Sequence, residues 1–287
     1  MSRISFFNYL QYAWGNRRAI ASHEGCADYT QRCAQSPEAA QLLQKARRAP
    51  SIEDSWRYDS TRRPLHDKLL AAYQLNEISG EGTAFERALR LMDWLTAHSC
   101  YNGMEIRASF LFQGKRETAD RLLRYTYDGG FARAINCRHK AFALADCLMT
   151  VGINALPVTI VQTGGCHLVV HAWLPEEERW VMLDPSLNSY ITDETGRALH
   201  LIEIYDRHRR GEQLHVAQYH LNGKQDCRDV YLNSFVLGCL LEIEVYNGTG
   251  SKRKGPRNRL VPEGVEPKDA KLRTITTMEL LAPPNSI

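Results

Sequence analysis

Apolar side chains recur at every third or fourth position in several stretches of the chain, and this period predicts helices with one buried face. One of them begins at or just before Cys137 and ends before Gly152. Capping residues support two others, because Ser36 and Thr83 stand where a helix N-cap is expected. The predicted helices span 36–48, 62–75, 83–101, 117–128, 137–151 and 199–211.

Shorter runs rich in β-branched and aromatic residues predict strands. Three of them follow the Cys137 helix, at 156–162, 167–174 and 179–184, and the last two form a hairpin through the turn at 175–178. One or two further strands are predicted within 230–246, and another within 271–281. Helices that precede an antiparallel sheet indicate an α+β fold.

The hairpin decides which polar side chains share a face. If Leu174 lies opposite Arg179, alternation along the strands puts His167, His171 and Asp184 on one face of the sheet. Asp184 is then a diagonal neighbour of both histidines. Its carboxylate can accept a hydrogen bond from an imidazole and fix the tautomer of that ring.

Cys137 stands at the start of a helix, where backbone N–H groups and the helix dipole lower the pKa of a thiol. Arg138, His139 and Lys140 add positive charge nearby. The order cysteine, histidine, aspartate within 137–184 is the order that a Cys-His-Asp thiol catalyst needs.

These residues resemble the transglutaminase-like superfamily, a branch of the papain-like cysteine enzymes. The resemblance covers roughly residues 85–201 and implies a nucleophile-bearing helix packed on an antiparallel sheet. Its motif residues are Cys137, Gly152-Ile153, His171-Ala172-Trp173, Trp180 and Asp184-Pro185.

The resemblance assigns three roles: Cys137 is the nucleophile, His171 the base and Asp184 the residue that orients the imidazole. Strand register alone leaves His167 and His171 equivalent, and the likeness of His171-Ala172-Trp173 to the His-Ala-Trp of the family selects His171. An acyl-transfer site also needs donors for the oxyanion. The backbone N–H of Cys137 is one, and the side-chain donor stays open among four residues, Asn136, Tyr101, Asn102 and Gln113.

Composition narrows the function. The 287 residues are 44% hydrophobic and 24% charged, with a net charge of +3, which favours a globular protein and points neither to nucleic acid nor to an acidic substrate. The basic run 251–259 is expected to be a solvated loop. The first residues lack the pattern of a signal peptide and no window is long enough to span a membrane, so a cytoplasmic location without membrane contact is expected.

The eight cysteines form no CxxC pair and no regular spacing, which argues against a zinc site or a disulfide framework. No metal or organic cofactor is expected. Cys166, beside His167, should point to the opposite face of its strand and lie in the core.

Three segments are expected: a helical N-terminal extension (1–82), a catalytic core (83–220) and a β-rich C-terminal extension (221–287) packed on the core. The predicted function is a thiol enzyme that acts on amide or peptide bonds through an acyl-enzyme on Cys137, as a cysteine protease, deamidase or transamidase. Its substrate would be a peptide, a protein or a carrier-bound acyl group.

Two alternatives remain. One is a biosynthetic, amide-forming acyltransferase, whose basic segments 207–210 and 252–259 would dock an acidic carrier. The other is a catalytically inactive binding domain. The sequence does not determine the oligomeric state.

Overall fold

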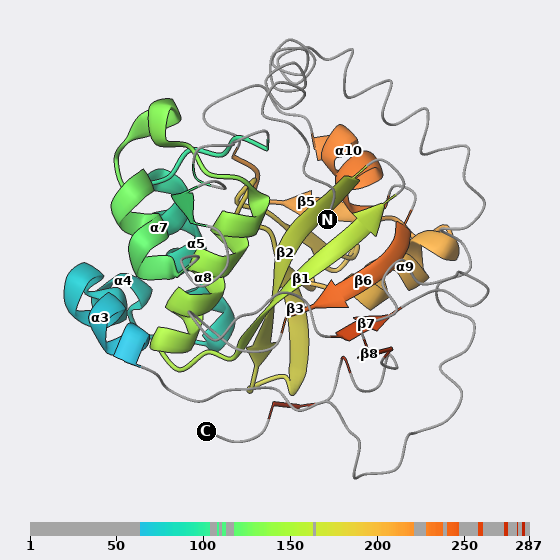
Figure 1. Ribbon diagram of the computed structural model, residues 1–287. Coiled ribbons are helices and arrows are strands. Elements are labelled where there is room, and N and C mark those ends of the chain that lie inside the picture. Colours follow the sequence, from blue (N-terminus) through green and yellow to red (C-terminus); the bar gives the residue numbers. More distant parts are fainter. Residues whose placement is uncertain are drawn as a thin grey trace, which may run out of the picture.

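The chain folds into helices and a mostly antiparallel sheet, which confirms the predicted α+β class (Figure 1). The computed structural model describes residues 64–103, 108, 111–112, 118–162, 165–220, 228–237, 240–246, 258–260, 273–274, 280 and 283–284. Within these residues, no helix is both long and apolar enough to cross a membrane.

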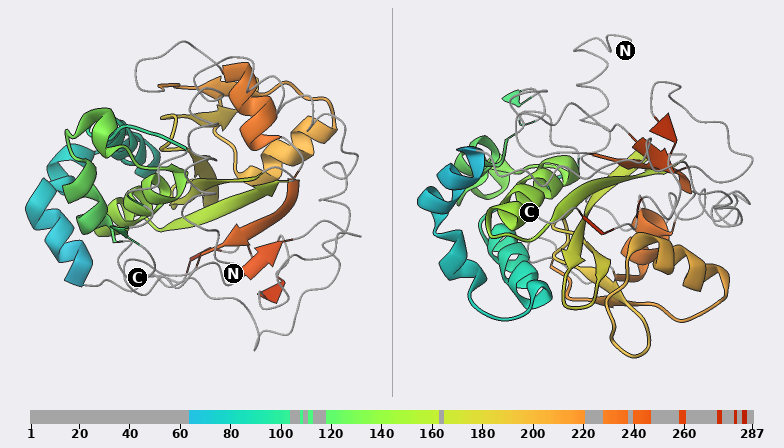
Figure 2. Two further views of the ribbon diagram at one scale, coloured as in Figure 1. Left: turned by 45° about the horizontal axis from the view of Figure 1, so that its top comes forward. Right: turned by 90° about the horizontal axis from the view of Figure 1, so that it is seen from below.

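One layer of helices covers one face of the sheet, and a second, smaller group of elements lies on the other face (Figure 2). The first layer consists of α3 (Pro64–Tyr73), α4 (Leu75–Ser79), α5 (Ala84–Ala97), α7 (Ala119–Thr126) and α8 (Cys137–Thr150), with the 3-10 turn η4 (Gly130–Arg133) before α8. The second consists of α9 (Leu201–Arg209), α10 (Arg228–Val230), the π-helical turn η5 (Tyr231–Val236) and the strand pair β4 (Tyr190–Thr192) and β5 (His215–Ala217).

The main sheet has the strand order β3-β2-β1-β6-β7-β8, and its pairs are antiparallel except for β7 with β8. The hairpin register is as predicted, with Leu174 opposite Arg179 and His171 opposite Met182. The strands are β1 (Ala155–Gln162), β2 (Gly165–Leu174), β3 (Arg179–Leu183), β6 (Leu240–Val245), β7 (Asn258–Leu260) and β8 (Arg273–Thr274).

The two faces of β2 belong to different hydrophobic cores, because side chains alternate along a strand. Leu168 and Val170 pack in the core that contains α8. Val169 and Trp173 pack in the other core, with Trp180 of β3 and residues of α9. The face predicted to carry both histidines is therefore the face turned away from the body of α8.

Helix α8 is buried on all sides, although its apolar period predicted one solvated face. Residues 139–150 are all buried. The sheet covers one side of the helix, and α3, α5 and α7 cover the other. Two charged residues, Lys140 and Asp146, are thereby enclosed, and the Asp146 carboxylate accepts a hydrogen bond of 3.3 Å from the first N–H of α7.

The capping pattern predicted for α5 is present. The Thr83 hydroxyl accepts from the N–H of Glu86, and the Glu86 carboxylate accepts from the N–H of Thr83. Of the one or two strands predicted within 230–246, one is present at Leu240–Val245, whereas Tyr231–Val236 is a π-helical turn. The predicted helix 36–48 lies outside the described residues.

Residues of all three predicted segments share these cores. Leu69 of α3 and Leu75 of α4 pack in the same core as α5 and α8, and β6 pairs with β1. The segment boundaries after residues 82 and 220 stay predictions.

Candidate active site

Cys137 is the first residue of α8, and its position is fixed from both sides. The Asn136 side chain caps the helix by accepting a hydrogen bond of 3.2 Å from the N–H of His139. Just before it, Ile135 forms a parallel bridge with Tyr101, supported by hydrogen bonds of 3.0 Å at each end. Cys137 as a whole residue is half-buried.

His167 of β2 hydrogen-bonds with the Cys137 thiol. The thiol also accepts a hydrogen bond from the backbone N–H of Leu168. Backbone N–H groups of successive residues in a strand point to opposite neighbouring strands. The N–H of Trp173 points toward β1, where it donates to the carbonyl of Asn154, so the N–H of Leu168, five residues earlier, points toward β3. Since β3 ends at Leu183, this N–H lies past the end of the strand, where the thiol receives it.

Asp184 follows β3 and completes a hydrogen-bonded chain. One carboxylate oxygen lies 2.5 Å from Nε2 of His167, which leaves Nδ1 of the imidazole for the thiol. The other oxygen accepts a hydrogen bond of 2.8 Å from the N–H of Ser186. Tyr231 closes the far side, with its ring edge-on to His167 and its hydroxyl beside the carboxylate. Both His167 and Asp184 are buried.

The surroundings lower the pKa values of Cys137 and Asp184 and raise that of His167. Burial acts to raise the pKa of Cys137, but the hydrogen bond and positive charge of His167 and the N–H of Leu168 outweigh it, and the net pKa is lowered. Burial acts to lower the pKa of His167, but Asp184 and Cys137 raise it to about 10. Burial acts to raise the pKa of Asp184, yet His167, the Ser186 N–H and Tyr231 bring it below its ordinary value. This pattern stabilises thiolate, imidazolium and carboxylate together.

The expected pairing of His171 with Asp184 is wrong. His171 is buried in the other core, and its Nε2 accepts a hydrogen bond of 3.4 Å from the N–H of Leu201 at the start of α9. Burial and the nearby His200 lower the pKa of His171 to about 3, so this ring stays neutral in ordinary buffers. The structure brings Cys137, His167 and Asp184 together and leaves His171 out.

The sequence contained a signal for His167. Helix α8 has 14 residues and rises about 21 Å, and β1 has 8 residues and returns over about 26 Å. The start of β2 is therefore level with Cys137. His171 lies four positions further along β2, about 13 Å toward the other end of the helix. The choice of His171 rested on the likeness to the family motif and did not use these lengths.

Among the four candidates for the oxyanion donor, Tyr101 interacts electrostatically with Cys137. The Asn136 oxygen caps α8, which leaves its NH2 group as the possible donor, and Gln113 lies outside the described residues. Tyr101 lies near both Cys137 and Asp184, and burial together with these negative charges keeps its pKa well above the ordinary value. Its hydroxyl therefore keeps its proton and can donate a hydrogen bond.

Cys166 is exposed, so the expectation of a core position is wrong. It is the second residue of β2, where the sheet ends and little packs over it. The other described cysteines, Cys100 and Cys147, are half-buried and buried, and burial raises the pKa of Cys147 far above its usual range. No cluster of metal-ligating side chains occurs among the described residues.

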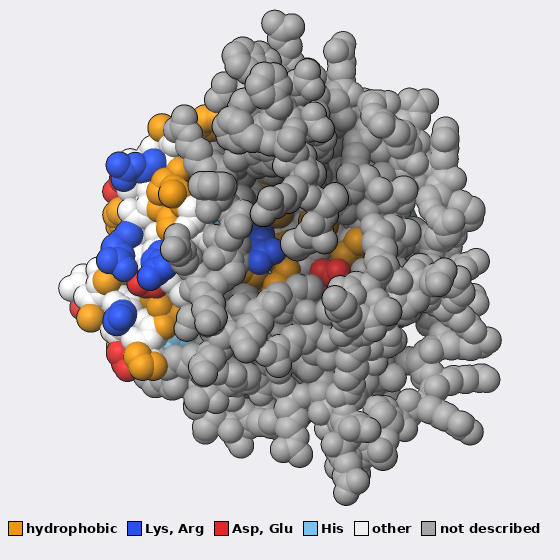
Figure 3. Space-filling model, in the orientation of Figure 1, with side chains coloured by type: hydrophobic (Ala, Val, Ile, Leu, Met, Phe, Trp, Pro, Cys, Tyr) orange, Lys and Arg blue, Asp and Glu red, His pale blue; other side chains and the backbone are white. Residues whose placement is uncertain are grey.

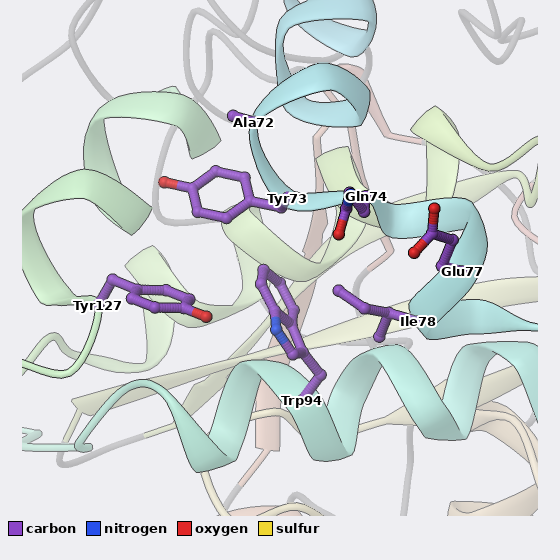
Figure 4. Close-up of a pocket in the computed structure, with 7 residues that line it drawn as sticks. All are labelled: Ala72, Tyr73, Gln74, Glu77, Ile78, Trp94 and Tyr127. Carbon is purple, nitrogen blue, oxygen red and sulfur yellow. The ribbon is translucent and has the colours of Figure 1, made fainter.

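A cavity of about 340 Å³ lies away from this site, in the outer helical layer. Trp94 of α5 lies between Tyr127 on one side and residues of α4 on the other (Figure 4). On the described part of one molecular face, Lys and Arg side chains alternate with hydrophobic ones over the helical layer and form no continuous basic surface (Figure 3).

Comparison with solved structures gives a partial match to a candidate cysteine protease from Cytophaga hutchinsonii. The TM-score is 0.33 and the identity 15%, and the match covers 54% of this chain and 50% of that protein. The chain thus spans half the length of the protein that it matches. No protein-family model and no curated protein matches the chain. The relation to the transglutaminase-like superfamily stays a prediction.

Proposed function

We propose that the protein is a thiol enzyme that cleaves amide or peptide bonds, with Cys137 as nucleophile, His167 as acid and base, and Asp184 as the residue that orients His167. The observation that carries this proposal is the hydrogen-bonded chain from the Cys137 thiol through His167 to Asp184. A reactive thiol with a base held by a third group is the arrangement expected for nucleophilic catalysis.

The reaction would proceed in two steps. The Cys137 thiolate attacks the carbonyl carbon, the C–N bond breaks, and the His167 imidazolium gives its proton to the leaving amine. Neutral His167 then removes a proton from water, and the resulting attack releases a carboxylic acid and restores the thiolate and imidazolium. An amine in place of water would give a transamidation product instead.

Two donors would stabilise the oxyanion. The N–H groups of the first turn of a helix have no partner within the helix, and that of Cys137 belongs to them. The Tyr101 hydroxyl is the side-chain candidate, because it interacts with Cys137 and keeps its proton. Removal of one such donor typically lowers kcat by about 10²-fold or more.

Hydrolysis is the outcome that we favour, because water needs no second binding site. Docking of an acidic carrier, on which the acyltransferase alternative depended, gains no support from the segment 207–210. Arg207 forms ion pairs with Asp193 (3.2 Å) and Glu212 (2.8 Å), and Arg210 forms one of 2.5 Å with Glu212. Their charges are largely compensated within the protein.

The test combines trapping with product analysis. A peptide library carrying a thiol-reactive electrophile should modify Cys137 in the wild-type protein, and peptide mass spectrometry locates the label. His167→Ala should lose the modification, and His171→Ala serves as the matched control from the same strand. Unmodified peptides with and without hydroxylamine then distinguish acid products from hydroxamates. Equal modification of the wild-type and His167→Ala proteins would contradict the proposal.

A further inference from the structure

Lys140 carries an ammonium group into the interior of the protein. It lies three positions after Cys137 on α8, which places both residues on neighbouring parts of the same helix face. Its side chain is 0% exposed, and its Nζ has no hydrogen-bond partner among the described residues. A buried, unpaired amine is costly, and such a group in a native protein calls for an explanation.

The groups around Lys140 belong to the candidate site. The carboxylate of Asp184 acts on its charge, and so does the thiol of Cys100. Asp184 also holds His167, and Tyr101 lies near both Asp184 and Cys137. Asp184 therefore interacts with two groups that can be cationic, with His167 by direct contact and with Lys140 electrostatically at longer range.

We propose that Lys140 is a positioning residue of this site, whose ammonium acts through Asp184 and supplies the fourth charge that balances thiolate, imidazolium and carboxylate. This inference rests on the proposed function. With the thiolate formed, the other three groups carry a net charge of −1, and the ammonium brings the sum to zero. With the thiol protonated, the same four groups carry +1.

The charge of Lys140 shifts the equilibrium between the thiol and the thiolate of Cys137. In a poorly solvated site the state with zero net charge is favoured over the charged state. A charged Lys140 therefore favours the thiolate and moves its formation to lower pH. Burial lowers the pKa of Lys140 to about 7, although Asp184 acts in the opposite direction. Lys140 is therefore charged in acidic solution, and it loses its charge, and with it the balance of the four charges, as the pH rises through neutrality.

Three variants separate charge from packing. Lys140→Met keeps the unbranched shape without a charge, and Lys140→Arg keeps a charge at every accessible pH. Lys68→Met removes an exposed lysine from α3 and is the matched control. All four proteins would carry Cys166→Ser, which removes the exposed thiol beside the site.

The readout is alkylation of Cys137 by iodoacetamide, followed by mass spectrometry over pH 4–9, which needs no substrate. In Lys140→Met we expect the midpoint of labelling about one pH unit higher than in wild type, because the attraction between the ammonium and the thiolate is lost. Lys140→Arg and Lys68→Met should keep the wild-type midpoint. Equal midpoints in Lys140→Met and wild type would overturn the inference.

A second reagent reports the charge beside the thiol in the wild-type protein itself. Iodoacetate is anionic, so its rate relative to iodoacetamide should fall several-fold as the pH rises through 7, when Lys140 loses its proton. The rate with iodoacetate relative to that with iodoacetamide should stay low at every pH in Lys140→Met and high in Lys140→Arg. If neither variant folds, a wild-type ratio that does not change with pH overturns the inference. Failure of Cys137 to react at any pH would instead refute the proposed function.

Discussion

The imidazole of His167 and the carboxylate of Asp184 lie 2.5 Å apart, from Nε2 to Oδ2, and both side chains are buried. His171, on the same strand, accepts a hydrogen bond from the backbone N–H of Leu201 instead. The two histidines consequently have pKa values of about 10 and about 3. Both rings are imidazoles with the same ordinary pKa, and their surroundings give them opposite protonation states.

Replacement of His167 should abolish the reactivity of Cys137, whereas replacement of His171 should leave it. We expect His167→Ala to lower kcat/KM by about 10²- to 10⁴-fold, because general acid and base catalysis is worth roughly this much. His171→Gln should chiefly lower stability, since it disturbs a buried site at the start of α9. Steady-state kinetics and thermal melts on both variants check this, and the reverse ranking would return the base to His171.

Asp184→Asn should lower the upper limit of the active pH range. Asp184 is the largest of the influences that raise the pKa of His167 to about 10, and without its charge the imidazolium loses its proton at lower pH. Activity in the wild-type protein is expected to fall as the pH rises through about 10, and in the variant at least about two units earlier. The pH dependence of kcat/KM measures both limits. A shared upper limit would show that Asp184 does not act on His167.

Removal of the Asn136 cap should affect both stability and reactivity. Loss of an N-cap typically costs about 1 kcal/mol of unfolding free energy, and here the capped helix begins at the nucleophile. Thr83→Ala removes the cap of α5 and is the matched control. Both variants should melt at lower temperature, but only Asn136→Ala should slow alkylation of Cys137. Equal rates in the two variants would mean that the cap does not position the thiol.

Lys140→Met should stabilise the fold, most strongly below pH 7. The folded-state pKa of Lys140 is about 7 and its ordinary value 10.5, so between these limits the unfolded chain binds more protons and wild-type stability rises with pH. The burial cost is fully present below pH 7 and disappears toward pH 10.5, at about 1.4 kcal/mol per unit of pKa shift. Urea denaturation of both proteins at pH 6 and pH 9 tests this. If Lys140→Met exceeds wild type in unfolding free energy by as much at pH 9 as at pH 6, the burial cost of the ammonium is contradicted.

Local patterns in the sequence predicted most of the elements around the site. The period of apolar residues located α5 and α8, the cap at Thr83 supported α5, and the hairpin register followed from the length of its turn. These features depend on neighbours in the chain, so they can be read without the fold. Strand propensity failed at Tyr231–Val236, where Tyr231 packs in the second core and its hydroxyl lies beside Asp184.

The sequence by itself determined that a cysteine begins a helix and that two histidines and an aspartate share one face of the following hairpin. Strand alternation could not decide which histidine meets the cysteine, because both have the same parity on the strand and both are diagonal to Asp184. Tertiary structure decided this by placing α8 across β1 and β2, so that Cys137 is level with the start of β2. It also enclosed Lys140, because burial on a second side of a helix depends on what other segments pack there.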